Sequence, residues 1–151
     1  MNNHELSTII LSDFQRIVET IATEAQWEIW MQAELLILLK QFNVRGTRKV
    51  PYPAPNSALH LDLLLTDNVS RKYAIELKVE SATNAATGFL RTIHADAEKI
   101  VKYTASVTAR WVVAICYNSM AKNELADYAS DPLNNAIFNI HGDIGCLVKT
   151  V

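Results

Sequence analysis

The chain has 151 residues, half of them hydrophobic, with a formal net charge of −2 and an isoelectric point of about 6.1. This length and composition suffice for one compact domain over residues 1–151, and we expect no second domain. The weak negative charge argues against a protein that holds nucleic acid by bulk electrostatics, although a local basic patch or a bound divalent cation can act where net charge does not.

The sequence shows no signal for a membrane or for secretion. Its longest apolar candidate, residues 29–39, is too short for a membrane span and is interrupted by Gln32 and Glu34. The first residues lack the basic region and apolar core of a secretory signal. We therefore expect a cytoplasmic protein without a membrane partner, in which Cys116 and Cys146 are buried reduced thiols.

The first part of the chain reads as helical. Apolar residues at helical spacing predict a helix over 6–23, where Ser12 and Asp13 mark a break or a cap. A second helix, 27–42, is apolar around most of its circumference and should be largely buried. Glu34 lies inside this apolar stretch, and an ionised side chain there needs a partner. It either faces a functional site or is a partly exposed helix glutamate.

A hairpin with charged residues on one face follows. A short strand over 47–50 and a proline-rich link lead into two strands, 59–66 and 73–80, joined by the polar loop 67–71. If Thr66 pairs with Lys72, antiparallel register places Asp62 opposite Glu76 and His60 opposite Lys78. Because side chains alternate along a strand, His60, Asp62, Glu76 and Lys78 then share one face.

The rest of the chain alternates helices and strands. Residues 81–84 break the strand and offer capping side chains for a helix over 85–106. The nearly continuous apolar run 110–117 predicts a central strand parallel to the Glu76 strand or to a neighbour of it. A helix over 119–130 and two edge strands, 136–140 and 146–151, complete the chain. Three basic residues of the 85–106 helix are either part of a solvated face or contacts for backbone phosphates: Arg91, Lys99 and Lys102.

The hairpin residues have a definite chemistry. Two carboxylates on adjacent strands, Asp62 and Glu76, together with the carbonyl of Leu77, form an oxygen-rich site suited to Mg²⁺ or Mn²⁺. A bound cation would neutralise charge on a phosphate and lower the pKa of an attacking water. Lys78 would orient that water or offset charge on the phosphorus. The alternative is an ordinary exposed Glu/Lys pair, since a three-residue motif is short.

In these residues the chain resembles the PD-(D/E)XK nuclease superfamily, which has the restriction-endonuclease-like fold. The resemblance rests on Asp62, on Glu76-Leu77-Lys78 in the next strand and on Glu34 in the preceding helix. It implies an α/β fold whose αβββαβ core, about 27–117, is a mixed sheet flanked by helices. The first helix and the C-terminal helix with its two edge strands would be additions. Leu61 stands where the family motif has a proline.

The resemblance also implies functions for these residues. Asp62 and Glu76 would bind the metal, Lys78 would assist the water, and Glu34 would complete the site. Apart from the resemblance, His60 is the nearest further side chain, and it is either a phosphate contact or metal-site neighbour or a hydrogen-bonded strand residue. We expect a metal-dependent endonuclease acting on nucleic acid, DNA rather than RNA. Homodimerisation, a partner protein or structure in the substrate would select where it cuts. The alternative is a catalytically idle nuclease-like binding protein, such as a toxin-immunity protein or an inhibitor, whose negative charge would suit a basic partner.

Overall fold

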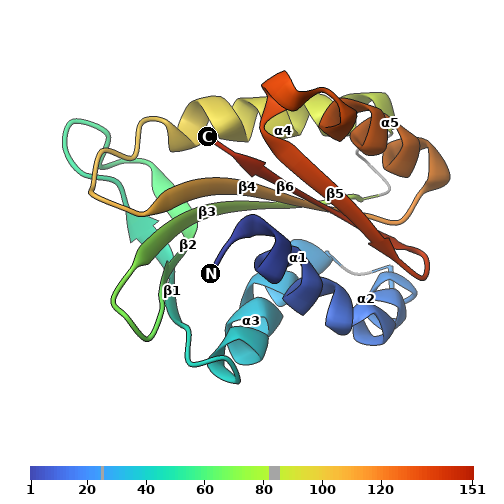
Figure 1. The fold of residues 1–151 in the computed structure, drawn as a ribbon, viewed down its shortest axis with the longest axis horizontal. Helices are drawn as coiled ribbons and strands as arrows, with labels where there is room; N and C mark the ends of the chain where they lie inside the picture. Colours follow the sequence, from blue (N-terminus) through green and yellow to red (C-terminus); the bar gives the residue numbers. More distant parts are fainter. Residues whose placement is uncertain (25, 82–85) are drawn as a thin grey trace.

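The computed structural model describes residues 1–24, 26–81 and 86–151, and for residues 86 and 87 the backbone alone. Its centre is a mixed six-stranded sheet in the order β1-β2-β3-β4-β6-β5 (Figure 1). The strands are β1 (Arg45–Pro51), β2 (His60–Thr66), β3 (Lys72–Val79), β4 (Ala109–Cys116), β5 (Ala136–His141) and β6 (Ile144–Thr150). β3 and β4 are parallel, and the other neighbours are antiparallel.

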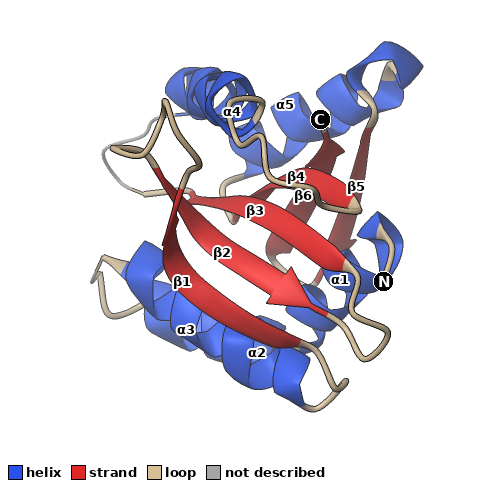
Figure 2. Cartoon of the chain, turned by 90° about the vertical axis from the view of Figure 1, so that its left-hand side faces the viewer, coloured by secondary structure: helices blue, strands red, loops and turns tan. Residues whose placement is uncertain are grey.

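Helices cover both faces of this sheet. One face carries α1 (Asn3–Ser12), α2 (Phe14–Ile21) and α3 (Trp27–Lys40), and the other carries α4 (Ala86–Ile100) and α5 (Ser119–Ser130) (Figures 1 and 2). The consecutive elements α3-β1-β2-β3-α4-β4 have the expected αβββαβ order. Among the residues that the structure describes, no helix is both long enough and apolar enough to cross a membrane.

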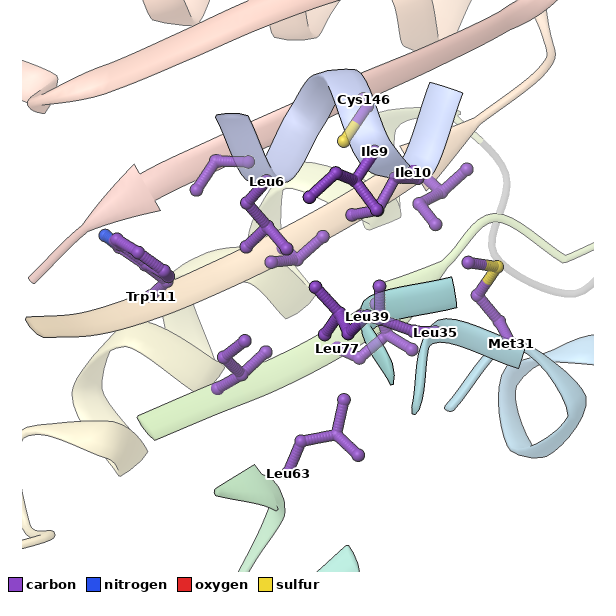
Figure 3. Close-up of a cluster of buried hydrophobic side chains, with 14 of the residues drawn as sticks. Leu6, Ile9, Ile10, Met31, Leu35, Leu39, Leu63, Leu77, Trp111 and Cys146 are labelled. Carbon is purple, nitrogen blue, oxygen red and sulfur yellow. The ribbon is translucent and has the colours of Figure 1, made fainter. Parts of the chain in front are cut away.

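Two apolar clusters fill the space between the sheet and the helices. The cluster under α1 and α3 includes Leu6, Leu35, Leu63 and Leu77 (Figure 3), and the one under α4 and α5 is built around Phe89, Val112 and Leu125. The odd-numbered residues of β3 therefore face α3, and its even-numbered residues face α4. Glu76 and Lys78 share the α4 face, as the alternation predicts.

The hairpin register agrees with the predicted one as far as Leu63. Thr66 pairs with Lys72, and the pairing continues to Leu63 opposite Ile75. The break in the first predicted helix is also found, because Asp13 separates α1 from α2. Asn118 caps α5, where its side chain accepts a hydrogen bond from the Met120 amide.

The place of β6 in the sheet and the end of α4 differ from the sequence expectation. β6 is an interior strand between β4 and β5, so the prediction of two edge strands at the end of the chain is wrong for 146–151. α4 ends at Ile100, earlier than the predicted residue 106, because the chain turns there to bury Tyr103 against Tyr52. Arg110 fixes this turn by donating to the Tyr103 carbonyl at 3.0 Å through Nε and 2.9 Å through Nη2. The predicted capping segment 81–84 lies largely outside the described residues.

Candidate functional site

The site forms where β2 and β3 separate. The two strands are paired as far as Leu63 and Ile75. On the side of β3 that faces β2, the next amide is that of Leu77, and it donates to Asp62 Oδ2 at 2.8 Å. The N–H and C=O of one strand residue point to the same side, so the Leu77 carbonyl also faces this gap. The Val79 backbone bonds to the carboxylate of Glu28, in the first turn of α3. Two carboxylates thus take the places that a paired strand would have filled.

A reversal in β1 brings a tyrosine to the same place. Lys49 has a positive φ of 53°, which is uncommon for a residue with a side chain. Arg48 bonds to Gln32 on the α3 face, whereas Val50 packs in the α4-side cluster, although residues two apart in a regular strand share a face. The strand therefore turns over at Lys49. This turn places Tyr52 on the α4 side, within reach of Glu76.

Glu76 is held between two donors from distant parts of the chain. The Tyr52 hydroxyl donates to Oε1 at 2.8 Å, and the Lys99 ammonium of α4 donates to Oε2 at 2.7 Å. The Glu76 side chain is only 1% exposed. Burial raises its pKa to about 7, and the nearby Asp62 carboxylate adds to this, while the bonds from Lys99 and Tyr52 act in the opposite direction.

Lys78 lies between two further carboxylates. Its ammonium is 3.5 Å from Asp96 Oδ2 on α4 and 3.7 Å from Glu28 Oε2 on α3. Burial by itself would lower the pKa of Lys78, but the charges of Asp96, Glu28 and Asp62 outweigh it and raise the pKa above its ordinary value. Lys78 is therefore a permanent cation at neutral pH.

These side chains make up one cluster, which we call the acidic cluster: Glu28, Asp62, Glu76, Lys78, Asp96 and Lys99. Four carboxylates and two ammonium groups give it a formal charge of −2 when all are ionised. Burial raises the pKa of Asp96 and of Glu28, each opposed first by Lys78. Asp96 Oδ2 is buried and, although near Lys78, has no partner in hydrogen-bonding geometry.

The cluster is open to solvent on one side. The side chains of Lys78, Lys99 and Glu28 are 26%, 30% and 36% exposed, whereas Glu76 is at its buried end. Within the described part of the chain, no three His, Cys, Asp or Glu side chains are arranged so that they could hold a metal ion as they stand. At Glu76, protein donors occupy both carboxylate oxygens.

Glu34 does not belong to the cluster, which corrects the expectation from the sequence. It is 3% exposed, and its Oε1 lies 2.6 Å from Arg16 Nη1 of α2. The partner that a buried carboxylate needs therefore comes from another helix rather than from a cation at the hairpin. Glu28 is the α3 glutamate that reaches the acidic cluster, because the first turn of α3 lies beside the end of β3, where Trp27 Nε1 donates to the Glu80 carbonyl at 2.8 Å.

The predicted phosphate contacts have separate environments. Lys99 is paired with Glu76, whereas Arg91 and Lys102 are exposed on the α4 side of the molecule. His60 is exposed, and its described strand partner is Pro51 of β1. The predicted pairings of Asp62 with Glu76 and of His60 with Lys78 are not formed in the β2–β3 register, which ends at Leu63.

Two large cavities lie away from the acidic cluster. One of about 930 Å³ lies between the end of α3, the start of β1 and the β2–β3 turn, and is lined by residues such as Lys40, Arg45 and Asp67. A neighbouring cavity of about 500 Å³ shares Asp67 and lies against α1. Both are at the opposite end of the hairpin from Asp62 and Glu76, and neither includes a residue of the acidic cluster.

Three side chains of the site were not expected from the sequence. Glu28 carried no signal in the sequence, and Asp96 was expected on a solvated helix face. Tyr52 lies in the link that was predicted to be a connection only. Comparisons with models of protein families, with curated proteins and with solved structures found no match to this chain.

Proposed function

We propose that the protein is a metal-dependent endonuclease that hydrolyses phosphodiesters of nucleic acid, DNA rather than RNA. The observation that carries this proposal is the convergence of Asp62, Glu76 and Lys78 at the point where β2 leaves β3. The αβββαβ order of the surrounding elements agrees with the restriction-endonuclease-like fold and with the PD-(D/E)XK resemblance. Glu28 would take the place that the resemblance gives to a glutamate of the preceding helix.

The donor groups suit a small divalent cation. Asp62, Glu76 and the Leu77 carbonyl would hold Mg²⁺ or Mn²⁺, because all three present hard oxygen ligands. When all six groups are ionised, the net charge of −2 on the acidic cluster is what one divalent ion would balance. When bound, the ion would neutralise charge on the phosphate and lower the pKa of the attacking water. Asp62 would keep the Leu77 peptide in place through its bond to the amide.

The electrostatics of Lys78 limit its role. Since neighbouring carboxylates raise its pKa, Lys78 stays protonated at neutral pH and cannot be the general base. It would instead donate hydrogen bonds to the attacking water or to the phosphate and stabilise negative charge that develops there. Asp96 and Glu28, on either side of its ammonium, would hold it in position for this task.

The acidic cluster would need further groups to hold nucleic acid. A chain with a net charge of −2 binds nucleic acid weakly by charge alone. A bound metal ion, the exposed Arg91 and Lys102, and either a second copy of the chain or a partner protein would provide the missing affinity and choose the position of the cut.

The test is a nicking assay on supercoiled DNA. We expect cleavage that requires Mg²⁺ or Mn²⁺, stops with EDTA, and is lost in Glu76→Ala and in the milder Glu76→Gln. Glu98→Gln is the matched control, because Glu98 is an exposed glutamate of the same helix as Lys99 and lies outside the acidic cluster. Cleavage that survives in the Glu76 variants would come from a contaminant and would refute the proposal.

A second candidate, an idle nuclease-like binding protein, is favoured by one specific observation. The ion pairs of Glu76 with Lys99 and of Lys78 with Asp96 neutralise the motif internally, as a purely structural network would. Its negative charge would suit a basic partner such as a nuclease toxin. Absence of both metal binding and cleavage in the wild-type protein would select this candidate over the endonuclease.

A further inference from the structure

Lys99 occupies the position at Glu76 that a metal ion would need. Its ammonium lies 2.7 Å from Glu76 Oε2, and the Tyr52 hydroxyl occupies the other oxygen. A magnesium ion bound to Oε2 would lie about 2.1 Å from that oxygen. Ion and ammonium would then be like charges within a few ångströms of each other, without water between them. Both cannot stay on the same oxygen.

The two partners of this ion pair differ in their freedom to move. Glu76 is 1% exposed and belongs to a strand paired with its parallel neighbour, so its carboxylate stays where it is. The Lys99 side chain is 30% exposed, and its ammonium lies at the end of a flexible four-carbon chain on the rim of the acidic cluster. If a cation displaces one partner, Lys99 is the one that leaves, and it leaves toward solvent.

The direction of that movement suits a polyanion. Lys99 lies in the last turn of α4, and Lys102, just beyond the helix, is exposed. An ammonium released from Glu76 would therefore stand at the open side of the acidic cluster with a second cation close to it in sequence. A phosphate that approaches a metal ion at Glu76 from solvent would reach the same region.

We propose that Lys99 is an internal counter-ion that neutralises Glu76 in the metal-free protein. When a divalent cation replaces it there, Lys99 moves to a phosphate of the nucleic acid; this inference rests on the proposed function. Lys99 thereby couples the two ligands. The metal ion must displace it, which weakens metal binding in the absence of nucleic acid. The released ammonium then strengthens nucleic-acid binding in the presence of metal, as linkage between two ligands requires.

The first measurement is Ca²⁺ affinity by isothermal titration calorimetry without nucleic acid. Lys99→Met should bind Ca²⁺ about tenfold more tightly than wild type, since no ammonium competes for Glu76. Lys99→Gln keeps a hydrogen-bond donor but not the charge, so it should also bind more tightly, and it serves if the methionine variant folds poorly. Lys72→Met is the control, because Lys72 is an exposed lysine at the start of β3 outside the acidic cluster, and it should leave Ca²⁺ affinity unchanged.

The second measurement is binding of a fluorescent DNA duplex by anisotropy, with and without saturating Ca²⁺, with the duplex checked for integrity on a gel. The gain in DNA affinity on adding Ca²⁺ should be about fivefold smaller in Lys99→Met than in wild type. Metal affinity and metal-dependent DNA affinity thus change in opposite directions. A lysine with only a structural role would lower both or leave both unchanged.

The outcomes separate this inference from the nuclease proposal. Unchanged or weaker Ca²⁺ binding in both Lys99→Met and Lys99→Gln would overturn the counter-ion role even in an active nuclease. Tighter Ca²⁺ binding in both variants, together with the smaller Ca²⁺-dependent gain in DNA affinity, would establish the exchange even in a wild-type protein that cuts no DNA, and only the nuclease proposal would then fail.

Discussion

Replacing Asp62 by alanine is expected to destabilise the fold as well as abolish metal binding. Asp62 Oδ2 accepts the Leu77 amide at 2.8 Å, at the position where β2 no longer supplies a carbonyl. Deleting a charged acceptor of a partly buried amide costs about 1.5–3 kcal/mol. For a chain of this size, 1 kcal/mol corresponds to about 2–4 °C in melting temperature, so Asp62→Ala should melt roughly 3–12 °C below wild type.

Asparagine separates the structural role of Asp62 from its role toward the metal. Asp62→Asn keeps an acceptor oxygen for the Leu77 amide but loses the charge, so it should retain most of the stability, within about 1 kcal/mol of wild type. It should nevertheless bind divalent cations at least about tenfold more weakly, because a neutral amide replaces a carboxylate ligand. Thermal unfolding followed by circular dichroism measures the first quantity and calorimetry the second. Wild-type stability in the alanine variant would refute the reasoning.

Three further predictions concern other parts of the molecule. Arg16→Met should lower the free energy of unfolding by about 1–3 kcal/mol, because it leaves Glu34 buried without its partner. Metal binding should stay unchanged, and weaker metal binding would show that Glu34 does take part in the site. Hydrogen bonds from Arg71 and Tyr73 outweigh burial and lower the pKa of Asp67 to about 2, below its ordinary 3.8. Asp67 therefore stabilises the folded state above about pH 4, and this contribution is lost as the pH falls through 2. In urea unfolding between pH 2 and 6, the free energy of unfolding should fall less steeply with decreasing pH in Asp67→Asn than in wild type. Burial raises the pKa of the Cys116 and Cys146 thiols to about 12. A thiol reagent at pH 8 should therefore label neither cysteine in the native protein and both after unfolding. Labelling of the native protein would contradict the buried positions.

The local features of the hairpin could be predicted because they depend on residues close in sequence. The alternation of Tyr73 to Val79, the polar loop before it and the pairing of Thr66 with Lys72 follow from a period of two and a short connection. These fixed the common face of Glu76 and Lys78. The prediction of a parallel strand over 110–117 was also confirmed, because a long helix between two strands makes a crossover connection.

The rest depends on contacts that the sequence does not encode locally. Which α3 glutamate reaches Lys78 is decided by where the end of β3 meets α3, and this selects Glu28 over Glu34. Tyr52 reaches Glu76 because Lys49 adopts a positive φ, for which no glycine gave a signal. The interior place of β6 is a matter of sheet order.

One signal for the α4 residues was present in the sequence. Asp96 and Lys99 are opposite charges three residues apart, next to the buried Ile93, Ala97 and Ile100. Charges that border an apolar stripe lie close to the sheet. Opposite a strand with the order Glu-x-Lys, a helix with Asp and Lys at this spacing offers the complementary pairing that the structure contains.

The most direct test of the central claim is a titration with Mn²⁺ followed by the line widths of the backbone amides in the NMR spectrum. The paramagnetic ion broadens signals according to their distance from it, and so reports the position of the bound cation. We expect the amides of Leu77 and Val79 to broaden first, the amide of Asp67 at the other end of the hairpin to stay sharp, and Glu76→Gln to abolish the effect. Broadening centred elsewhere, or none at millimolar Mn²⁺, would contradict a metal site between β2 and β3.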